Sequence, residues 1–196
     1  MSERKAEGVE ATNAEFLVYS NVDIALMPYF YSAVCKWLDD GFDALVINRR
    51  TISARYTDCA QIPLMYSAVG DKHEGHDCFV FRRDAYPRYA LAEVCIGIPW
   101  VGRALIWNLV CHARKFQELT DEHLTFHVGH GNESTLGDRI YTDYRRYNRG
   151  EAAKAQAALR GSRGPFEGRS PFDVYPLDFD LVTPGRLKRW LRRLRP

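Results

Sequence analysis

Two polar residues, Asn21 and Asp23, follow directly on the short, mostly apolar run EFLVYS at residues 15–20. If this run is a buried strand, both residues stand at its carboxyl end, where the ligand crevices of α/β folds open. An aspartate there offers the oxygen ligands that Mg²⁺ and Mn²⁺ prefer. Asn and Asp also cap helices well, so a simple strand-to-helix turn is the alternative interpretation.

A second candidate ligand lies late in the chain, where three of the six histidines fall within residues 123–130. His127 stands near the end of the run LTFHV, just before Gly129, so we expect it at a strand end. A divalent cation held by Asp23 and His127 would tie together segments that are far apart in the sequence. A histidine with a structural role only is the alternative.

The stretch HEGHDCFVFRRD, residues 73–84, places Asp77 at the start of an apolar strand. A carboxylate in that position can act as a general base or orient a sugar hydroxyl, and we expect its neighbour His76 to contact the substrate. A rival interpretation makes His73, His76 and Cys78 zinc ligands. Their spacing matches no common zinc pattern, and no second half of such a pattern follows.

Two arginines and a tryptophan complete the candidate site. Arg49 and Arg50 follow a strand in INRRTI and can reach a diphosphate or an acceptor anion. Side chains alternate along a strand, so only one of the two should face the site. Trp100, in GIPW at the head of a helix, is predicted to form a wall for a sugar ring, whereas Trp107 is predicted to pack in the core.

These residues need a framework of strands and helices to bring them together. The expected strands are residues 15–20, 42–50, 76–83 and 124–131, and the expected helices are 28–41, 101–116 and 138–160. Residues 51–75 lack periodicity and are expected to form an ordered loop. The early strand–helix–strand order favours parallel pairing. The predicted fold is therefore an α/β fold with a mixed, mostly parallel sheet flanked by helices.

The composition indicates one globular domain. The chain has 196 residues, of which 46% are hydrophobic and 27% charged. We expect a disordered leader at 1–14, an α/β domain at 15–160, a linker at 161–182 and a basic amphipathic helix at 183–196. No apolar run approaches the roughly 18 residues of a membrane span, and the polar start is unlike a secretory signal. The five cysteines lack paired spacing, which predicts mostly buried free thiols and a cytoplasmic protein.

Positive charge is concentrated at the end of the sequence. The segment 183–196 holds six of the 27 Lys and Arg residues and no acidic residue, so the rest of the chain is mildly acidic. This uneven charge argues against a general nucleic-acid binder. Leu187, Trp190, Leu191 and Leu194 form one helical stripe, which predicts peripheral contact with an anionic membrane. The alternative is that the stripe packs on the protein itself.

Taken in order, the motifs resemble one known family. NxDI after a strand, INRR, GHDCFVFRR, CIGIPWVGRALIWNL and LTFHVG are similar to the catalytic half of type-A glycosyltransferase domains, over roughly residues 15–130. The resemblance implies transfer of a sugar from a nucleotide sugar to a glycan acceptor, with Mn²⁺ or Mg²⁺ as cofactor. It implies that Asp23 and His127 bind the metal, Asn21 stands beside it, Asp77 is the acceptor-side carboxylate and Trp100 lies beside the acceptor.

The chain departs from that pattern at its start. Only about 15 residues precede the first strand, fewer than the roughly 30 of one βαβ unit, so we expect this sequence to lack the nucleotide-binding half. Three interpretations stay open: a shortened enzyme, an enzyme completed by a second protein chain, and a non-catalytic module that binds a glycan, a nucleotide or a partner.

Overall fold

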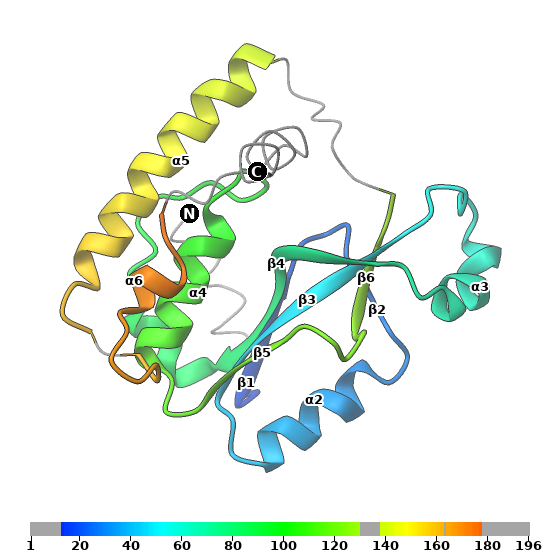
Figure 1. Ribbon diagram of the computed structural model, residues 1–196, viewed down its shortest axis with the longest axis horizontal. Coiled ribbons are helices and arrows are strands. Elements are labelled where there is room, and N and C mark those ends of the chain that lie inside the picture. Colours follow the sequence, from blue (N-terminus) through cyan, green and yellow to red (C-terminus); the bar gives the residue numbers. More distant parts are fainter. Residues whose placement is uncertain (1–12, 130–137, 163, 178–196) are drawn as a thin grey trace, which may run out of the picture.

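The sheet has six strands that mix both directions of pairing (Figure 1). The computed structural model describes residues 13–129, 138–162 and 164–177. The strands are β1 (Phe16–Ser20), β2 (Ala25–Leu26), β3 (Ala44–Ile52), β4 (Asp71–Arg82), β5 (Phe116–Leu119) and β6 (Thr125–Val128). They lie in the order β1-β4-β3-β6-β2, and β5 also pairs with β3. The predicted mixed α/β class is confirmed.

The balance of strand directions differs from the expectation. Strand β3 runs parallel to β5 and β6, but the pairs β1–β4, β3–β4 and β2–β6 are antiparallel. The early strand–helix–strand unit does not pair directly, because the twelve-residue strand β4 lies between β1 and β3. Strand β4 carries the apolar run CFVF, whose side chains are all buried because helices cover both faces of the sheet at this point.

Alternation along β3 and β4 divides the core into two layers. Leu45, Ile47 and Val80 pack with Phe30 and Val34 of α2 (Phe30–Asp39) on one face. On the other face, the intervening residues pack against α4 (Val101–His112) and α5 (Asp138–Ala158), and helix α6 (Pro171–Val174) lies beside them (Figure 1). Each fully buried aliphatic side chain stabilises the fold by about 1.5–3 kcal/mol.

Helix α2 ends where the sequence predicts. Gly41 has a φ of 87°, and its N–H donates to the carbonyl of Leu38 at 2.9 Å. This left-handed conformation is easy for glycine and closes the last turn of the helix. The chain then enters β3 and returns to the sheet.

The region 51–75, expected to form an ordered loop, contains regular secondary structure. It contains η1 (Cys59–Gln61) and α3 (Ile62–Ser67), which project from the sheet between β3 and β4 (Figure 1). Asp58 accepts a hydrogen bond from the N–H of Ala60, and the Gln61 side chain accepts one from the N–H of Asp58. This reciprocal capping stabilises the first turn of the helix. It does not depend on a hydrophobic pattern, so the absence of periodicity did not reveal it. A further short helix, η2 (Arg83–Arg88), follows β4.

The expected linker at 161–182 is not a linker over its described part. Tyr175 is buried, and Phe166, Phe172 and Leu177 pack against the core on the α4 side. The indole N–H of Trp107 donates to the carbonyl of Tyr175 at 2.7 Å. The prediction failed because the polar, glycine-rich residues around these aromatics conceal their packing role. Residues 1–12 of the expected leader and the whole basic helix 183–196 lie outside the described residues.

The cysteines are free thiols, but burial is less general than predicted. Cys78 is buried, whereas Cys35 and Cys59 are exposed. Cys35 lies on the solvent side of α2, so its apolar sequence neighbours belong to the other face of the helix. Among the described residues, no helix combines the length and apolar character that crossing a membrane requires.

Candidate functional site

A bulge in β4 shapes the candidate site. Ile47 of β3 pairs with Cys78, but the next residue, Asn48, pairs with His76, so Asp77 has no partner directly opposite. The next register pair is Arg50 with Lys72, which leaves further unpaired residues in β4. Bulges interrupt the alternation of side chains and redirect them. This is why Asp77 and His76 have unrelated partners although they are adjacent.

Asp77 is held by residues from three parts of the sheet. Its Oδ1 accepts a hydrogen bond from Nδ2 of Asn21 at 2.9 Å, and its Oδ2 lies 3.2 Å from Nη1 of Arg49. The side chains of Arg49 and Asp77 are each only 11% exposed. His73 closes the group, because its Nε2 lies 3.3 Å from Nη2 of Arg49. The cluster therefore joins an amide, a buried ion pair and an imidazole.

One of the two adjacent arginines lies in this cluster, and the other does not. Arg49 faces Asp77, whereas Arg50 lies near His123. Burial lowers the pKa of His123, and the positive charge of Arg50 lowers it further. The different directions agree with alternation along β3, although no contact here tests the predicted role of either arginine in binding a diphosphate.

Asp23 and His127 form the second part of the site. Oδ2 of Asp23 lies 3.2 Å from Nε2 of His127, with the aspartate side chain 55% exposed and the histidine side chain 7% exposed. Nδ1 of His127 lies 2.7 Å from the carbonyl oxygen of Gly129. Gly129 has a φ of 76°, a conformation that favours glycine and turns this carbonyl toward the ring.

The imidazole of His127 thus faces an oxygen acceptor on each side. The carbonyl of Gly129 can only accept a hydrogen bond, so Nδ1 carries a proton. The other ring nitrogen, Nε2, faces the carboxylate of Asp23. The contact with the carboxylate is favourable if Nε2 also carries a proton. The geometry would also be compatible with a cation in place of that proton, because a backbone carbonyl on the other ring nitrogen is a usual arrangement for a metal-binding histidine.

Asp23 and His127 offer a cation one carboxylate and one imidazole, of which the carboxylate is the donor that suits Mg²⁺ and Mn²⁺. No group of three or more His, Cys, Asp or Glu side chains suited to a metal exists among the described residues. Asp23 and His127 would therefore supply two ligands, and water or phosphate oxygens would supply the others. Mg²⁺ sites commonly combine one or two carboxylates with substrate phosphates, and here a histidine would stand beside the single carboxylate.

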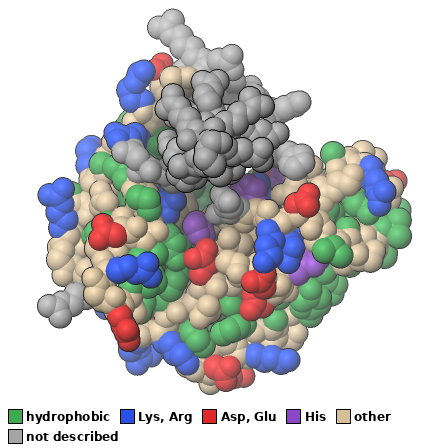
Figure 2. Space-filling view, viewed as in Figure 1, with side chains coloured by type: hydrophobic (Ala, Val, Ile, Leu, Met, Phe, Trp, Pro, Cys, Tyr) green, Lys and Arg blue, Asp and Glu red, His purple; other side chains and the backbone are tan. Residues whose placement is uncertain are grey.

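His76 belongs to a different group from Asp77. Its Nε2 lies 2.9 Å from Oε1 of Glu118, and the hydroxyl of Tyr175 donates to the other oxygen of Glu118 at 2.8 Å. Burial acts to raise the pKa of Glu118, but the hydrogen bonds from His76 and Tyr175 outweigh it and hold that pKa below its usual range. On the face of the molecule that Figure 2 shows, histidine side chains lie near the centre, among acidic and basic side chains.

The sequence did not identify Glu118 as a site residue. The only available signal for Glu118 was one carboxylate within the short strand FQEL.

The rival zinc site is not formed among the described residues. The three residues of the rival site have separate surroundings: His73 lies by Arg49, His76 by Glu118, and Cys78 in the core beside α2. The strand bulge separates side chains that are close in sequence.

Trp100 and Trp107 both donate hydrogen bonds to the segment that follows α6. The indole N–H of Trp100 donates to the carbonyl of Leu177 at 3.0 Å, and the guanidinium of Arg145 lies 5.7 Å from its ring centre. Trp107 is fully buried, as expected for a core residue. The polar edge of Trp100 is thus engaged within the protein, and its contact with a sugar ring stays a prediction.

Comparison with protein-family models and with curated proteins gives no match. Among solved structures, the fold is similar to a crystal structure of S. aureus TarS 1–349 in complex with UDP-GlcNAc, at a TM-score of 0.46 and 10% sequence identity. The match covers 80% of this chain and 50% of that chain, so the protein spans about half the length of that relative. This likeness concerns the course of the chain and says nothing about metal, substrate or activity.

Proposed function

We propose that the protein is a glycosyltransferase-like protein that binds a nucleotide sugar with a divalent metal at Asp23 and His127. The observation that carries the proposal is the 3.2 Å contact between Oδ2 of Asp23 and Nε2 of His127, with the other ring nitrogen held by the carbonyl of Gly129. The order of motifs along the sequence, similar to the catalytic half of type-A glycosyltransferases, supports the same function.

The residues of the chain have distinct parts in this proposal. When bound, a cation such as Mn²⁺ or Mg²⁺ supplies charge neutralisation to a diphosphate leaving group. The exposed carboxylate of Asp23 and the ring of His127 hold it. Asn21, which donates to Asp77 at 2.9 Å, fixes that carboxylate so that it can orient an acceptor hydroxyl. The glycan acceptor would approach from the side of Asp77.

A non-catalytic binding module is the second candidate. One observation favours it: the Asp77 carboxylate already accepts from Asn21 and is paired with Arg49 in a nearly buried contact. A general base must be free to take a proton from the substrate. If Asp77 keeps its partners during binding, the site recognises a nucleotide sugar without transferring the sugar, or needs a second chain to complete the reaction.

Isothermal titration calorimetry with UDP, GDP and CDP tests the proposal, each with Mn²⁺ and with EDTA. We expect binding that needs Mn²⁺ and that weakens at least about tenfold in Asp23→Asn and in His127→Gln, the loss of one charge-assisted contact. Asp143→Asn is the control, because Asp143 is an exposed carboxylate of α5 paired only at the surface with Arg146.

Two results would overturn the metal site. One is binding of a nucleotide with equal strength in Mn²⁺ and in EDTA. The other is an equal loss of binding in the Asp143→Asn control. Product formation from a nucleotide sugar that binds then separates the enzyme from the binding module.

A further inference from the structure

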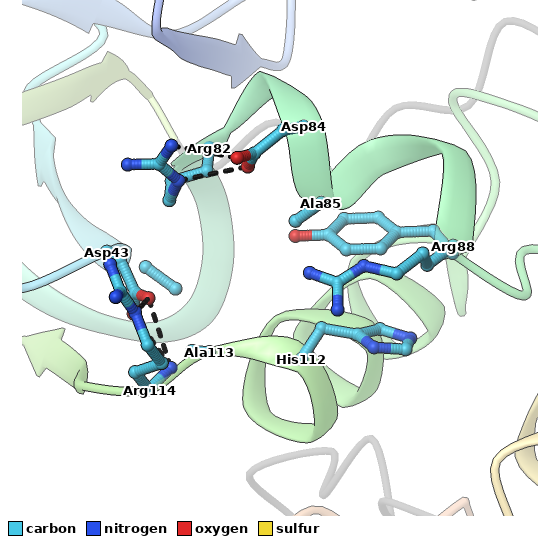
Figure 3. A pocket seen from close by; sticks show the side chains of 10 residues that line it. Asp43, Arg82, Asp84, Ala85, Arg88, His112, Ala113 and Arg114 are labelled. Carbon is cyan, nitrogen blue, oxygen red and sulfur yellow. Dashed lines mark hydrogen bonds and ion pairs between the residues drawn. The ribbon is translucent and has the colours of Figure 1, made fainter.

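A pocket of about 430 Å³ lies beside η2 and the end of α4 (Figure 3). It is formed where β3 begins and β4 ends, the point at which Ala44 pairs with Phe81. Its polar lining consists mainly of three arginines, two aspartates and a histidine: Asp43, Arg82, Asp84, Arg88, His112 and Arg114. The volume is within the usual range of small-molecule sites.

Both aspartates of the pocket already have hydrogen-bond partners, and each also lies beside an arginine, Asp84 by Arg82 and Asp43 by Arg114. Asp84 is held by Arg82 through two hydrogen bonds, of 2.9 and 2.8 Å. Asp43 accepts from the backbone N–H groups of Arg114 and Lys115 at 3.0 and 2.9 Å. These carboxylates therefore build the walls and do not act as free negative charges.

Two arginines retain donors that no described residue uses. Among the described residues, no side chain forms a hydrogen bond or close ion pair with the guanidinium of Arg88, although its charge helps to lower the pKa of Asp84. Arg114 uses its Nε on Asp43 at 3.2 Å, while its side chain is 81% exposed and its two terminal nitrogens stay available. Figure 3 shows Arg88 and His112 on one side of the pocket and Arg114 with Asp43 on the other.

His112 supplies an unused acceptor. Its Nε2 is buried and has no hydrogen-bond partner among the described residues. Burial lowers the pKa of His112 and the charge of Arg88 lowers it further, while a hydrogen bond to the backbone of Arg88 acts against them, so the neutral ring is favoured. Because that bond uses the other ring nitrogen as a donor, Nε2 is left as an acceptor in the neutral ring. The ring also stacks on Tyr89, with centroids 5.5 Å apart and planes at 14°. A neutral buried acceptor of this kind is satisfied by a hydroxyl donor.

We propose that this pocket binds a small phosphate monoester that carries hydroxyl groups, such as a sugar phosphate. Two arginine side chains lie on opposite walls, and the terminal N–H groups of each can donate to phosphate oxygens, although the charge of Arg114 is shared with Asp43. A hydroxyl of the same ligand donates to Nε2 of His112. The site is independent of Asp23, His127 and any metal.

Calorimetry in EDTA tests the site with glucose 6-phosphate, glucuronate, inorganic phosphate and glucose as probes. We expect glucose 6-phosphate to bind one site per chain and more tightly than the other three probes. Arg88→Gln and Arg114→Gln should each weaken its binding at least about tenfold, the loss of one charged contact. His112→Phe, which keeps the ring, should remove the preference for glucose 6-phosphate over inorganic phosphate.

The control is Arg146→Gln, which removes an exposed arginine of α5 far from the lining of the pocket. An equal loss in this control would mean nonspecific attraction and would overturn the site. The proposal also fails if the wild-type protein does not bind glucose 6-phosphate up to about 10 mM. It fails again if Arg88→Gln and Arg114→Gln bind as the wild type does. None of these outcomes depends on the nucleotide experiment, which needs Mn²⁺.

Discussion

The carboxylate of Asp23 lies 3.2 Å from Nε2 of His127, although one residue follows the first strand and the other lies in the last. Because β6 pairs with the carboxyl-terminal part of β3, His127 lies directly opposite Thr51. The turn after β1 then brings Asp23 over the same strand end. This contact links segments from the start and the end of the sheet-forming sequence. Substituting either residue therefore tests whether a cation binds there.

Mn²⁺ should raise the thermal stability of the protein through this contact. A ligand that binds only the folded state adds about 2.7 kcal/mol at one hundred times its dissociation constant. We expect differential scanning calorimetry to show a rise in Tm with MnCl₂ for the wild type and none for Asp23→Asn or His127→Gln. Asp143→Asn should respond as the wild type does. An unchanged rise in Asp23→Asn would place the cation elsewhere.

The Arg49–Asp77 pair should couple strongly in unfolding experiments. Removing one member leaves a buried charge without its partner, so Arg49→Met and Asp77→Asn should each cost about 3–5 kcal/mol in free energy of unfolding. The double variant should cost much less than the sum of the two. The matched surface pair Arg146–Asp143, whose side chains are 77% and 60% exposed, should couple by at most about 1 kcal/mol in the same urea experiment. Additive effects at Arg49 and Asp77 would show that the pair is not buried in solution.

Glu118 should contribute stability that is lost in acid. Its pKa is lower in the folded protein than in the unfolded chain, despite burial, because His76 and Tyr175 donate to it. The stabilisation is thus present above the ordinary glutamate pKa of about 4.3 and disappears as pH falls through the lower folded value. Urea unfolding at several pH values should show Glu118→Gln less stable than the wild type at pH 7, with the difference shrinking in acid. Glu167→Gln, at an exposed position, is the control. A difference that stays constant with pH would contradict this linkage.

The cysteines should differ in reactivity toward a disulfide reagent. Burial, together with the negative charge of Asp77, raises the pKa of Cys78 to about 12, so almost no thiolate forms at neutral pH. Cys35 and Cys59 are exposed. We expect these two thiols to react with Ellman's reagent in the native protein, with one fast equivalent lost in each of Cys35→Ser and Cys59→Ser. Cys78 should react only after unfolding, and rapid reaction of Cys78 in the native state would be the contrary result.

The sequence by itself determined the elements with strong local signals. Strand β1, helices α2 and α4, and the core position of Trp107 follow from apolar periodicity and from stop signals such as Gly41. Mixed α/β architecture follows from the order of these elements. The placement of polar residues at strand ends also identified Asp23 and His127 as candidates, although their role as ligands stays a prediction.

Only the tertiary structure decided which of these residues meet. Sequence periodicity cannot show that β4 lies between β1 and β3, because strand pairing depends on contacts between distant segments. It also cannot reveal the bulge at Asp77, which turns His76 toward Glu118 while Asp77 joins Asn21 and Arg49. A bulge is an extra residue relative to a partner strand, so it has no meaning until the two strands are paired. For the same reason, the pocket between Arg88 and Arg114 exists only in the folded chain.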